Sequence, residues 1–299
     1  MDDGARILDG KAIASEMLAE TARDLEAFRA EHGTTPSIVV VIVGSDPASE
    51  VYARRILKTA ERIGADGRIV ELPEATDEAQ LRAALRGLSV DEAVTGIILQ
   101  LPLPKPLDVR HVVEALDPLK DLDGIHPFNA GLVSRGATGF APSCAEAALV
   151  ILKRSGVPIA GRPTVVIGRS NVVGRPAQLL LIAEDATVTV CHRRTRDVPK
   201  ELGRAEVVVV AAGSPGLVDG RDIRPGAVVV DCGINVRADG SIVGDVDLPS
   251  VLQVAGAVTP VPGGVGPVTN AVLMQHLMRA ARAQAAGGFP DAIAVGAGS

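Results

Sequence analysis

The stretch PTVVIGRSNVVGRP at residues 163–176 decides the fold of one half of this chain. A run of β-branched residues ends at Gly168, a short turn follows, and Gly174 opens an amphipathic stretch. This order predicts a buried strand, a tight turn and a helix. Turn amides and the helix dipole then point at one place, which favours a bound phosphate. Because the spacing is not GxGxxG, and such turns also occur in α/β proteins without a ligand, the turn alone does not decide the function.

The end of the next predicted strand indicates which ligand the turn would bind. A NAD-binding fold usually places an acidic residue there, about 20 residues after the glycines, against the ribose hydroxyl. This chain has His192, Arg193 and Arg194 instead. A cation at this place can bind a 2′-phosphate, and Arg169 can approach the same group, so the residues favour NADP over NAD. The alternative for Arg194 and Arg196 is a solvated strand end.

A similar pattern occurs in the first half, where SIVVVIVG at residues 37–44 predicts a fully buried strand. We therefore expect a two-domain α/β protein with an N-terminal βαβ catalytic domain, a C-terminal Rossmann-like parallel sheet and a cleft between them. Pro- and Gly-rich joints divide the chain into residues 1–141 with the C-terminal helix 267–299, and residues 142–266. The expected helices are 11–31, 47–64, 77–88, 108–116, 144–155, 174–184 and 267–286, and the expected strands are 37–44, 67–73, 95–101, 163–168, 186–191, 205–212, 227–232 and 256–258.

Composition excludes several classes of protein. The 299 residues include 36 acidic and 30 basic side chains, 47% hydrophobic residues and 2% aromatic residues. Such a chain can build a core, and it lacks the basic face or stacking rings of a nucleic-acid binder. Without a signal-peptide pattern or an apolar run of about 18 residues, we expect a cytoplasmic protein that binds no membrane. Cys144, Cys191 and Cys232 lack ligand spacing, so we expect neither a disulfide framework nor a metal.

Nine short motifs are spaced along nearly the whole chain. They are DGK at 9–11, Gly44 with DPAS at 46–49 and Tyr52, QLPLP at 100–104, KDLDG at 120–124, NAG at 129–131, the turn at 168–176, DCGIN at 231–235, GDV at 244–246, and PVPGGVGPVT at 260–269. In order and spacing they resemble the methylenetetrahydrofolate dehydrogenase/cyclohydrolase family. QLPLP and PVPGGVGPVT are too long for chance to be a good explanation.

The resemblance implies a homodimer of one-carbon metabolism with a small-molecule folate substrate. Members oxidise 5,10-methylenetetrahydrofolate to the 5,10-methenyl form with NADP, and bifunctional members then hydrolyse the product to 10-formyltetrahydrofolate. By position, it implies that Tyr52 stacks on the pterin and aminobenzoate region and that Gln100 and Asp123 hold the folate, as the catalytic set. Pro262, Gly263 and Gly264 would line the cleft. The resemblance and the cations after the second strand together imply a set of cofactor contacts. They are Gly168, Arg169, Ser170, Val173, Gly174, His192, Arg193 and Ile234.

The chain departs from the family at the catalytic lysine. The family places this lysine one helical turn after the tyrosine, where this chain has Ile56. An aliphatic side chain cannot carry the proton that hydrolysis of the methenyl bridge requires. Lys58 lies about 200° further round the helix, and the Arg55 guanidinium stays charged. We therefore expect an NADP-dependent dehydrogenase whose cyclohydrolase activity is weak or absent.

Three other functions stay open. The protein keeps both activities if Gln100, Asp123 or a shifted Lys58 relays the water. It acts on a modified tetrahydropterin if residues 142–145, which read Pro-Ser-Cys-Ala where the family has Pro-Cys-Thr-Pro, change the wall near the pterin. It is a non-catalytic folate- or NADP-binding paralogue if the substitution at Ile56 abolishes the chemistry.

For Asp121 and His276 we expect no direct part in the chemistry. We expect Asp121 to cap or brace the loop that presents Asp123. We expect His276 to be a surface residue, because nothing at metal-ligand spacing surrounds it.

Overall fold

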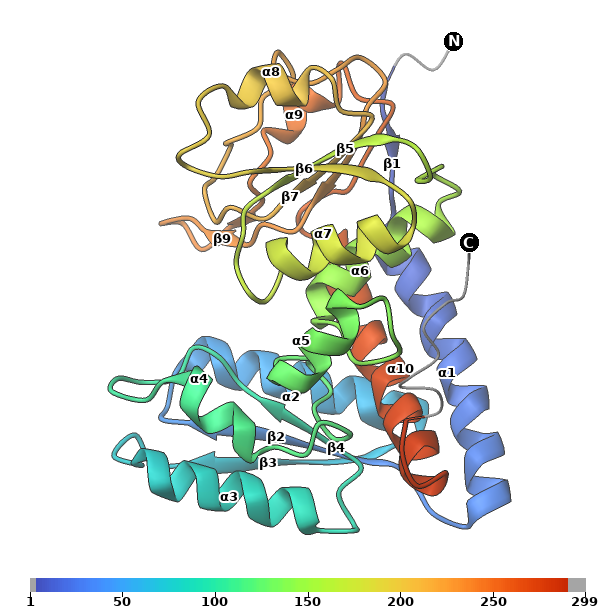
Figure 1. Cartoon of the computed structure of the whole chain (residues 1–299), viewed down its shortest axis with the longest axis vertical. Coiled ribbons are helices and arrows are strands. Elements are labelled where there is room, and N and C mark those ends of the chain that lie inside the picture. Colours follow the sequence, from blue (N-terminus) through green and yellow to red (C-terminus); the bar gives the residue numbers. More distant parts are fainter. Residues whose placement is uncertain (1–3, 290–299) are drawn as a thin grey trace. The chain divides into compact units, whose positions relative to one another are not determined.

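The computed structural model describes residues 4–289 and divides the chain into two compact units (Figure 1). Among these residues, unit 1 contains residues 4–15 and Cys144–Thr269, and unit 2 contains Glu16–Ser143 and residues 270–289. Each unit has its own parallel sheet with helices, which confirms the predicted two-domain α/β class. In the described part of the chain, no helix is long and apolar enough to cross a membrane.

Unit 2 is built on a three-stranded parallel sheet in the order β3-β2-β4. The central strand β2 (Ser37–Val43) pairs with β3 (Asp66–Leu72) on one side and β4 (Gly96–Leu99) on the other. Its odd-numbered valines pack against Leu81 and Leu85 of α3 (Glu78–Val90). Figure 1 shows α2 (Pro47–Ile63) on the opposite side of the strands. Because both faces are covered, β2 is a continuous apolar run rather than an alternating one.

The helices of unit 2 begin at capping residues. Asp46 caps α2 by accepting a hydrogen bond from the Ser49 backbone N–H, and Asp77 forms a capping box with Gln80 at α3. Gly64 ends α2 in the left-handed region at φ +86°. The other helical segments are α4 (Val109–Val112), the 3-10 turn η1 (Val113–Ala115), α5 (Pro127–Ser134), and most of α1 (Gly10–His32) and α10 (Val265–Ala285).

Unit 1 contains a six-stranded parallel sheet in the order β1-β11-β8-β7-β5-β6. Counted from β5 (Pro163–Ile167), the central order is that of a doubly wound sheet, in which the chain changes direction between β5 and β7 (Val207–Val210). Ligands of such sheets bind at the carboxyl ends of the strands at this switch point. The remaining elements are β6 (Thr187–Cys191), β8 (Val228–Asp231), β11 (Ala257–Val258), the β9–β10 hairpin (Asn235–Val236 and Ile242–Val243), α6 (Ser143–Arg154), α7 (Gly174–Ala183), α8 (Val198–Leu202) and α9 (Leu248–Val251).

The beginning of the chain differs from the expected division. Strand β1 (Arg6–Ile7) pairs in parallel with β11, and residues 4–15 therefore group with unit 1 instead of the first domain. A two-residue strand leaves no periodicity to recognise in the sequence. The same reason explains why α5, α8, α9, β9 and β10 have no counterpart among the expected elements, since each is short.

Asp121 braces the loop after α4, as expected. It is 1% exposed and forms a bridge with Ile97 of β4. Its carboxylate accepts hydrogen bonds from the backbone N–H groups of Ile125 (3.2 Å) and His126 (2.8 Å) and from Asn129 Nδ2 (2.9 Å). Burial raises the pKa of Asp121 to about 6, although these donors act in the opposite direction.

Replacing Gly96 by Ala should destabilise unit 2. An added Cβ would lie 2.3 Å from Cδ1 of the fully buried Leu122, so that side chain must move, at a cost of about 1–3 kcal/mol. The control is Gly87→Ala in α3, where nothing lies within 4 Å and a gain of about 0.5–1 kcal/mol is expected. Urea denaturation measures both free energies of unfolding. Equal effects of the two substitutions would contradict the packing argument.

The pKa of Asp121 predicts how the effect of Asp121→Asn depends on pH. The folded-state value of about 6 lies above the ordinary 3.8, so the stability from this group is fully present below pH ~4 and is lost as the pH rises through about 6. The destabilisation by Asp121→Asn should therefore be larger at pH 4 than at pH 7.5, by at most about 3 kcal/mol. Urea titrations at both pH values measure it, with exposed Asp66→Asn as background. A destabilisation that grows with pH would mean that the N–H donors outweigh burial.

Candidate functional site

Helix α2 carries Tyr52 and Ile56 one turn apart. Tyr52 is half-buried, whereas Ile56 is 0% exposed. The structure describes every residue of α2. Its buried residues are Ser49, Ala53, Ile56, Ala60 and Ile63, and none of these side chains titrates. Lys58 and Arg55 are both exposed. The structure therefore places no proton carrier on the buried face of this helix.

Gln100 directly follows β4, at the carboxyl end of the unit 2 sheet. Its backbone N–H donates to the Val41 carbonyl (2.9 Å), which continues the pairing with β2. Its side chain is half-buried, and Nε2 donates to the carbonyl of Leu101 (3.0 Å). Because α2 follows the neighbouring strand β2, Tyr52 and Gln100 both lie after the carboxyl ends of paired parallel strands, where ligands of α/β sheets usually bind.

Asp123 belongs to the loop that Asp121 braces. Its Oδ1 accepts a hydrogen bond from Ser143 Oγ at 2.5 Å. Burial raises the pKa of the Asp123 carboxyl, while the Ser143 hydrogen bonds and the nearby His276 lower it. A half-buried carboxyl in this setting is closer to the range in which a group exchanges protons near neutral pH than an exposed one is.

The expectation that His276 is a surface residue is wrong. His276 lies on α10 and is 0% exposed. Its Nδ1 donates to the backbone carbonyl of Leu122 (2.7 Å), and its ring packs 5.2 Å from the ring of Phe140. The sequence gives no signal for this contact, because 154 residues separate the two partners.

In unit 1, the predicted glycine turn is closely packed. Gly168 has φ +112°, and an added Cβ there would lie 2.1 Å from the carbonyl oxygen of Ala211. A Cβ on Gly174 would lie 2.2 Å from the carbonyl oxygen of Gly168. Ser170 Oγ accepts hydrogen bonds from the backbone N–H groups of Val173 (3.2 Å) and Gly174 (3.4 Å). Both glycines therefore form a cradle that a side chain would fill, at the start of α7, which fits the pyrophosphate of a dinucleotide.

The basic residues lie beside this turn. Ile167 pairs with Cys191, and Gly168 N–H donates to the Cys191 carbonyl (2.9 Å), so His192 follows directly at the same sheet edge. The His192 backbone N–H donates to Thr195 Oγ1 (2.9 Å), which closes a turn in which Arg193 and Arg194 are exposed. Arg169 is exposed as well. The turn and the cations therefore lie close enough in the fold for one dinucleotide to contact both.

Two buried aspartates that sequence reasoning missed hold the other loops of this sheet edge. Asp245 is 0% exposed and accepts hydrogen bonds from the backbone of Ala212 (2.6 Å), Gly213 (2.8 Å) and Ser214 (2.8 Å). Asp231 is 3% exposed, and its acceptor bonds to Gly233, Asp245 and Val246 backbone N–H groups are 2.8–3.1 Å long. Their signal in the sequence is their place in the DCGIN and GDV motifs, which says nothing of their partners.

The remaining residues of unit 1 that we predict to contact the cofactor or line the cleft lie after β8 and β11. Ile234, three residues after Asp231 at the end of β8, is 67% exposed. Gly10 lies so close to Gly264 that an added Cβ would be 1.8 Å from its carbonyl oxygen. Gly263 has φ +110°, with the Lys11 side chain 3.4 Å from the position of a Cβ. The DGK and PVPGG motifs, about 250 residues apart, therefore pack together, beside the exposed Pro262.

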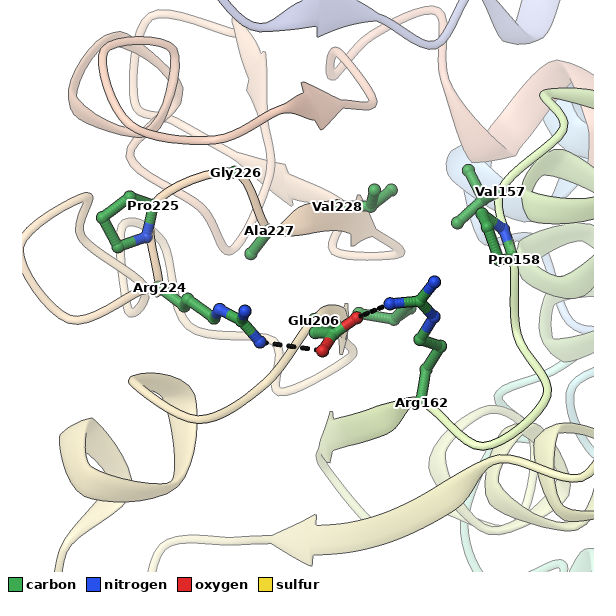
Figure 2. Close-up of a pocket in the computed structure, with 10 residues that line it drawn as sticks. Val157, Pro158, Arg162, Glu206, Arg224, Pro225, Gly226, Ala227 and Val228 are labelled. Carbon is green, nitrogen blue, oxygen red and sulfur yellow. Dashed lines mark hydrogen bonds and ion pairs between the residues drawn. The ribbon is translucent and has the colours of Figure 1, made fainter.

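A separate pocket lies at the opposite edge of the unit 1 sheet. Figure 2 shows Glu206 between Arg162 and Arg224, with ion pairs of 2.5 Å and 2.8 Å. These residues precede or surround the amino-terminal ends of β5, β7 and β8. The pocket is therefore distinct from the edge that carries Gly168 and His192.

Comparisons with known proteins agree with this arrangement. Residues 8–123 match the catalytic domain of the tetrahydrofolate dehydrogenase/cyclohydrolase family, and residues 142–285 match its NAD(P)-binding domain. The bifunctional protein FolD of Chloroflexus aurantiacus is 49% identical over 93% of this chain and 98% of its own length. That of Roseiflexus sp. (strain RS-1) is 46% identical over 94% and 98%.

Solved structures show the same similarity. The bifunctional enzyme FolD of Campylobacter jejuni has a TM-score of 0.91 and 35% identity, covering 94% of this chain and 99% of that one. The Trypanosoma brucei dehydrogenase-cyclohydrolase, solved with NADP cofactor and an inhibitor, has a TM-score of 0.90 and 34% identity with the same coverage. The predicted dinucleotide-binding domain is thus confirmed. This chain belongs to the tetrahydrofolate dehydrogenase/cyclohydrolase family.

Proposed function

We propose that this protein oxidises 5,10-methylenetetrahydrofolate to 5,10-methenyltetrahydrofolate with NADP and hydrolyses this product to 10-formyltetrahydrofolate. The observation that carries the proposal is the Gly168 cradle with cations at its side, in a chain that is 49% identical to a protein named bifunctional. The resemblance further supports a homodimer that works in the cytoplasm.

In the oxidation, the protein mainly binds and orients the substrate. Tyr52 would stack on the folate, and Gln100 and Asp123 would supply polar contacts, while Pro262, Gly263 and Gly264 would line the site. N5 of the folate supplies electrons as the bridging carbon gives up its hydride, so orientation dominates the step and little acid or base chemistry is needed. Bound NADP supplies the hydride acceptor. Gly168, Arg169, Ser170, Val173, Gly174, His192, Arg193 and Ile234 would hold it.

The hydrolysis requires a group that exchanges a proton with the attacking water. Ile56 cannot do so, and it is fully buried. Asp123 is the better candidate, because burial raises the pKa of its carboxyl, and Gln100 can orient a water. In this proposal Asp123 acts as the ionised carboxylate that accepts the proton of the attacking water, in place of the lysine that the family resemblance implies at position 56.

A second candidate function is a dehydrogenase with weak or absent cyclohydrolase activity, which the burial of Ile56 favours. The names of the relatives support the bifunctional enzyme proposed above better than this second candidate. A protein that binds without reacting, or that prefers a modified tetrahydropterin, would give a different result in the assay described below.

Arg193→Ser should change the choice of cofactor. If the guanidinium binds the 2′-phosphate, its loss removes a charge-assisted contact and raises KM for NADP about tenfold or more, with little change for NAD. Steady-state kinetics with both cofactors measure the ratio. The matched control is Arg196→Ser, an exposed arginine of the same cluster, for which both constants should stay the same. A uniform loss for NADP and NAD would contradict a contact with the 2′-phosphate.

A two-signal assay should separate the two candidate functions by following NADPH and the methenyl product independently. In a bifunctional enzyme, NADPH forms while the methenyl product stays low, and Asp123→Asn raises the methenyl signal relative to NADPH. If the methenyl product instead accumulates and clears only at its spontaneous rate, the dehydrogenase-only function holds, and Ile56→Lys should add hydrolysis. Ile56→Met is the control for side-chain length without charge.

The same assay tests the remaining functions. NADP binding without NADPH formation would leave only the non-catalytic paralogue. NADPH formation with a modified tetrahydropterin but not with tetrahydrofolate would change the substrate.

A further inference from the structure

Ser143 engages the carboxylate of Asp123. The distance of 2.5 Å between Ser143 Oγ and Asp123 Oδ1 is typical of a charge-assisted O–H···O⁻ bond. Ser143 is the first residue of α6 and is 3% exposed, so water competes little for its hydroxyl. Its backbone N–H is a second donor to the same carboxylate. One residue therefore provides two donors to this group.

Other groups near Asp123 also affect whether its carboxyl is ionised. Burial favours the neutral carboxyl, whereas the donors of Ser143 and the His276 side chain of α10 favour the ionised one. Asp121 is the second carboxylate of the loop, but its oxygens already accept hydrogen bonds from Ile125, His126 and Asn129. Ser143 is thus the direct hydrogen-bond partner on which the charge and the orientation of Asp123 depend.

We propose that Ser143 is a positioning residue for the folate substrate: its hydroxyl holds the Asp123 carboxylate ionised and in one orientation, so that it accepts hydrogen bonds from the N–H groups of the substrate. This inference rests on the proposed function, in which Asp123 contacts folate. Without the hydroxyl, the carboxyl would be free to rotate and would take up a proton more readily. A protonated carboxyl presents a donor where the substrate requires an acceptor.

Three substitutions separate the hydrogen bond from the shape of the side chain. Ser143→Ala removes the donor. Ser143→Thr keeps a hydroxyl donor, so a hydrogen-bond role leaves it like the wild type and separates it from Ser143→Ala. The matched control is Ser134→Ala at the end of α5, where the hydroxyl donates to the Gly131 carbonyl (2.8 Å) away from Asp123.

The first measurement needs no activity. Carbon-13 NMR of aspartate-labelled protein follows the Asp123 carboxyl as a function of pH, with Asp123→Asn to assign the signal. The midpoint should move to higher pH in Ser143→Ala and stay in place in Ser143→Thr and Ser134→Ala. Urea midpoints of all variants show whether each remains folded.

The second measurement is kinetic. KM for 5,10-methylenetetrahydrofolate should rise about tenfold in Ser143→Ala but not in Ser143→Thr, while KM for NADP stays the same. An unchanged Asp123 midpoint in Ser143→Ala, or a Ser143→Ala enzyme with wild-type KM, would overturn the inference while the proposed function stands. A wild-type protein that forms no NADPH from this substrate would overturn the proposed function and the folate part of this inference together, whatever the NMR midpoint does.

Discussion

Buried aspartates hold the loops on which both parts of the candidate site depend. Their carboxylate oxygens accept hydrogen bonds from backbone N–H groups. Asp245 and Asp231 fix the loops after β7 and β8, and Asp121 fixes the loop that carries Asp123. A buried carboxylate is costly unless its lone pairs are used, and buried amides are costly unless they find acceptors. Each aspartate meets both needs at once. The side chains that would touch the ligands, such as Ile234 and Asp123, are therefore presented by loops whose shape is fixed before any ligand arrives.

Close backbone contacts impose a second constraint. At Gly168 and Gly174, and again where Gly10 meets Gly264, the chain approaches so closely that even one methyl group would collide with a carbonyl oxygen. At the first of these places the contact shapes a turn at the start of α7 that fits a phosphate. At the second it joins the DGK motif near one end of the chain to PVPGG near the other. Motifs that seem independent in the sequence are thus halves of one packed contact.

Ile56 and Asp123 together show how the burial of a residue changes a functional argument. Residue 56 is an isoleucine where the family resemblance implies a lysine, and a dehydrogenase without hydrolysis is the expectation that follows from the sequence. The sequence does not show that Asp123 is half-buried in the folded chain. Asp123 is half-buried beside Ser143 and His276. Burial raises the pKa of its carboxyl, and the hydrogen bonds from Ser143 lower it, so Asp123 is a candidate for the same chemistry. The relatives that are named bifunctional fit this second interpretation.

The sequence by itself determined the two-domain α/β class, the parallel strands, and the glycine turn with cations at the next strand end. These features depend on runs of apolar β-branched residues, glycines and charges that lie close together along the chain. It also indicated that Asp121 is a brace. The pairing of β1 with β11, the burial of His276 against Leu122, and the contacts of Asp231 and Asp245 were decided only by the tertiary structure. Each joins segments that are distant in sequence or too short for a period, and the desolvation that sets the pKa of Asp123 exists only once those segments have packed.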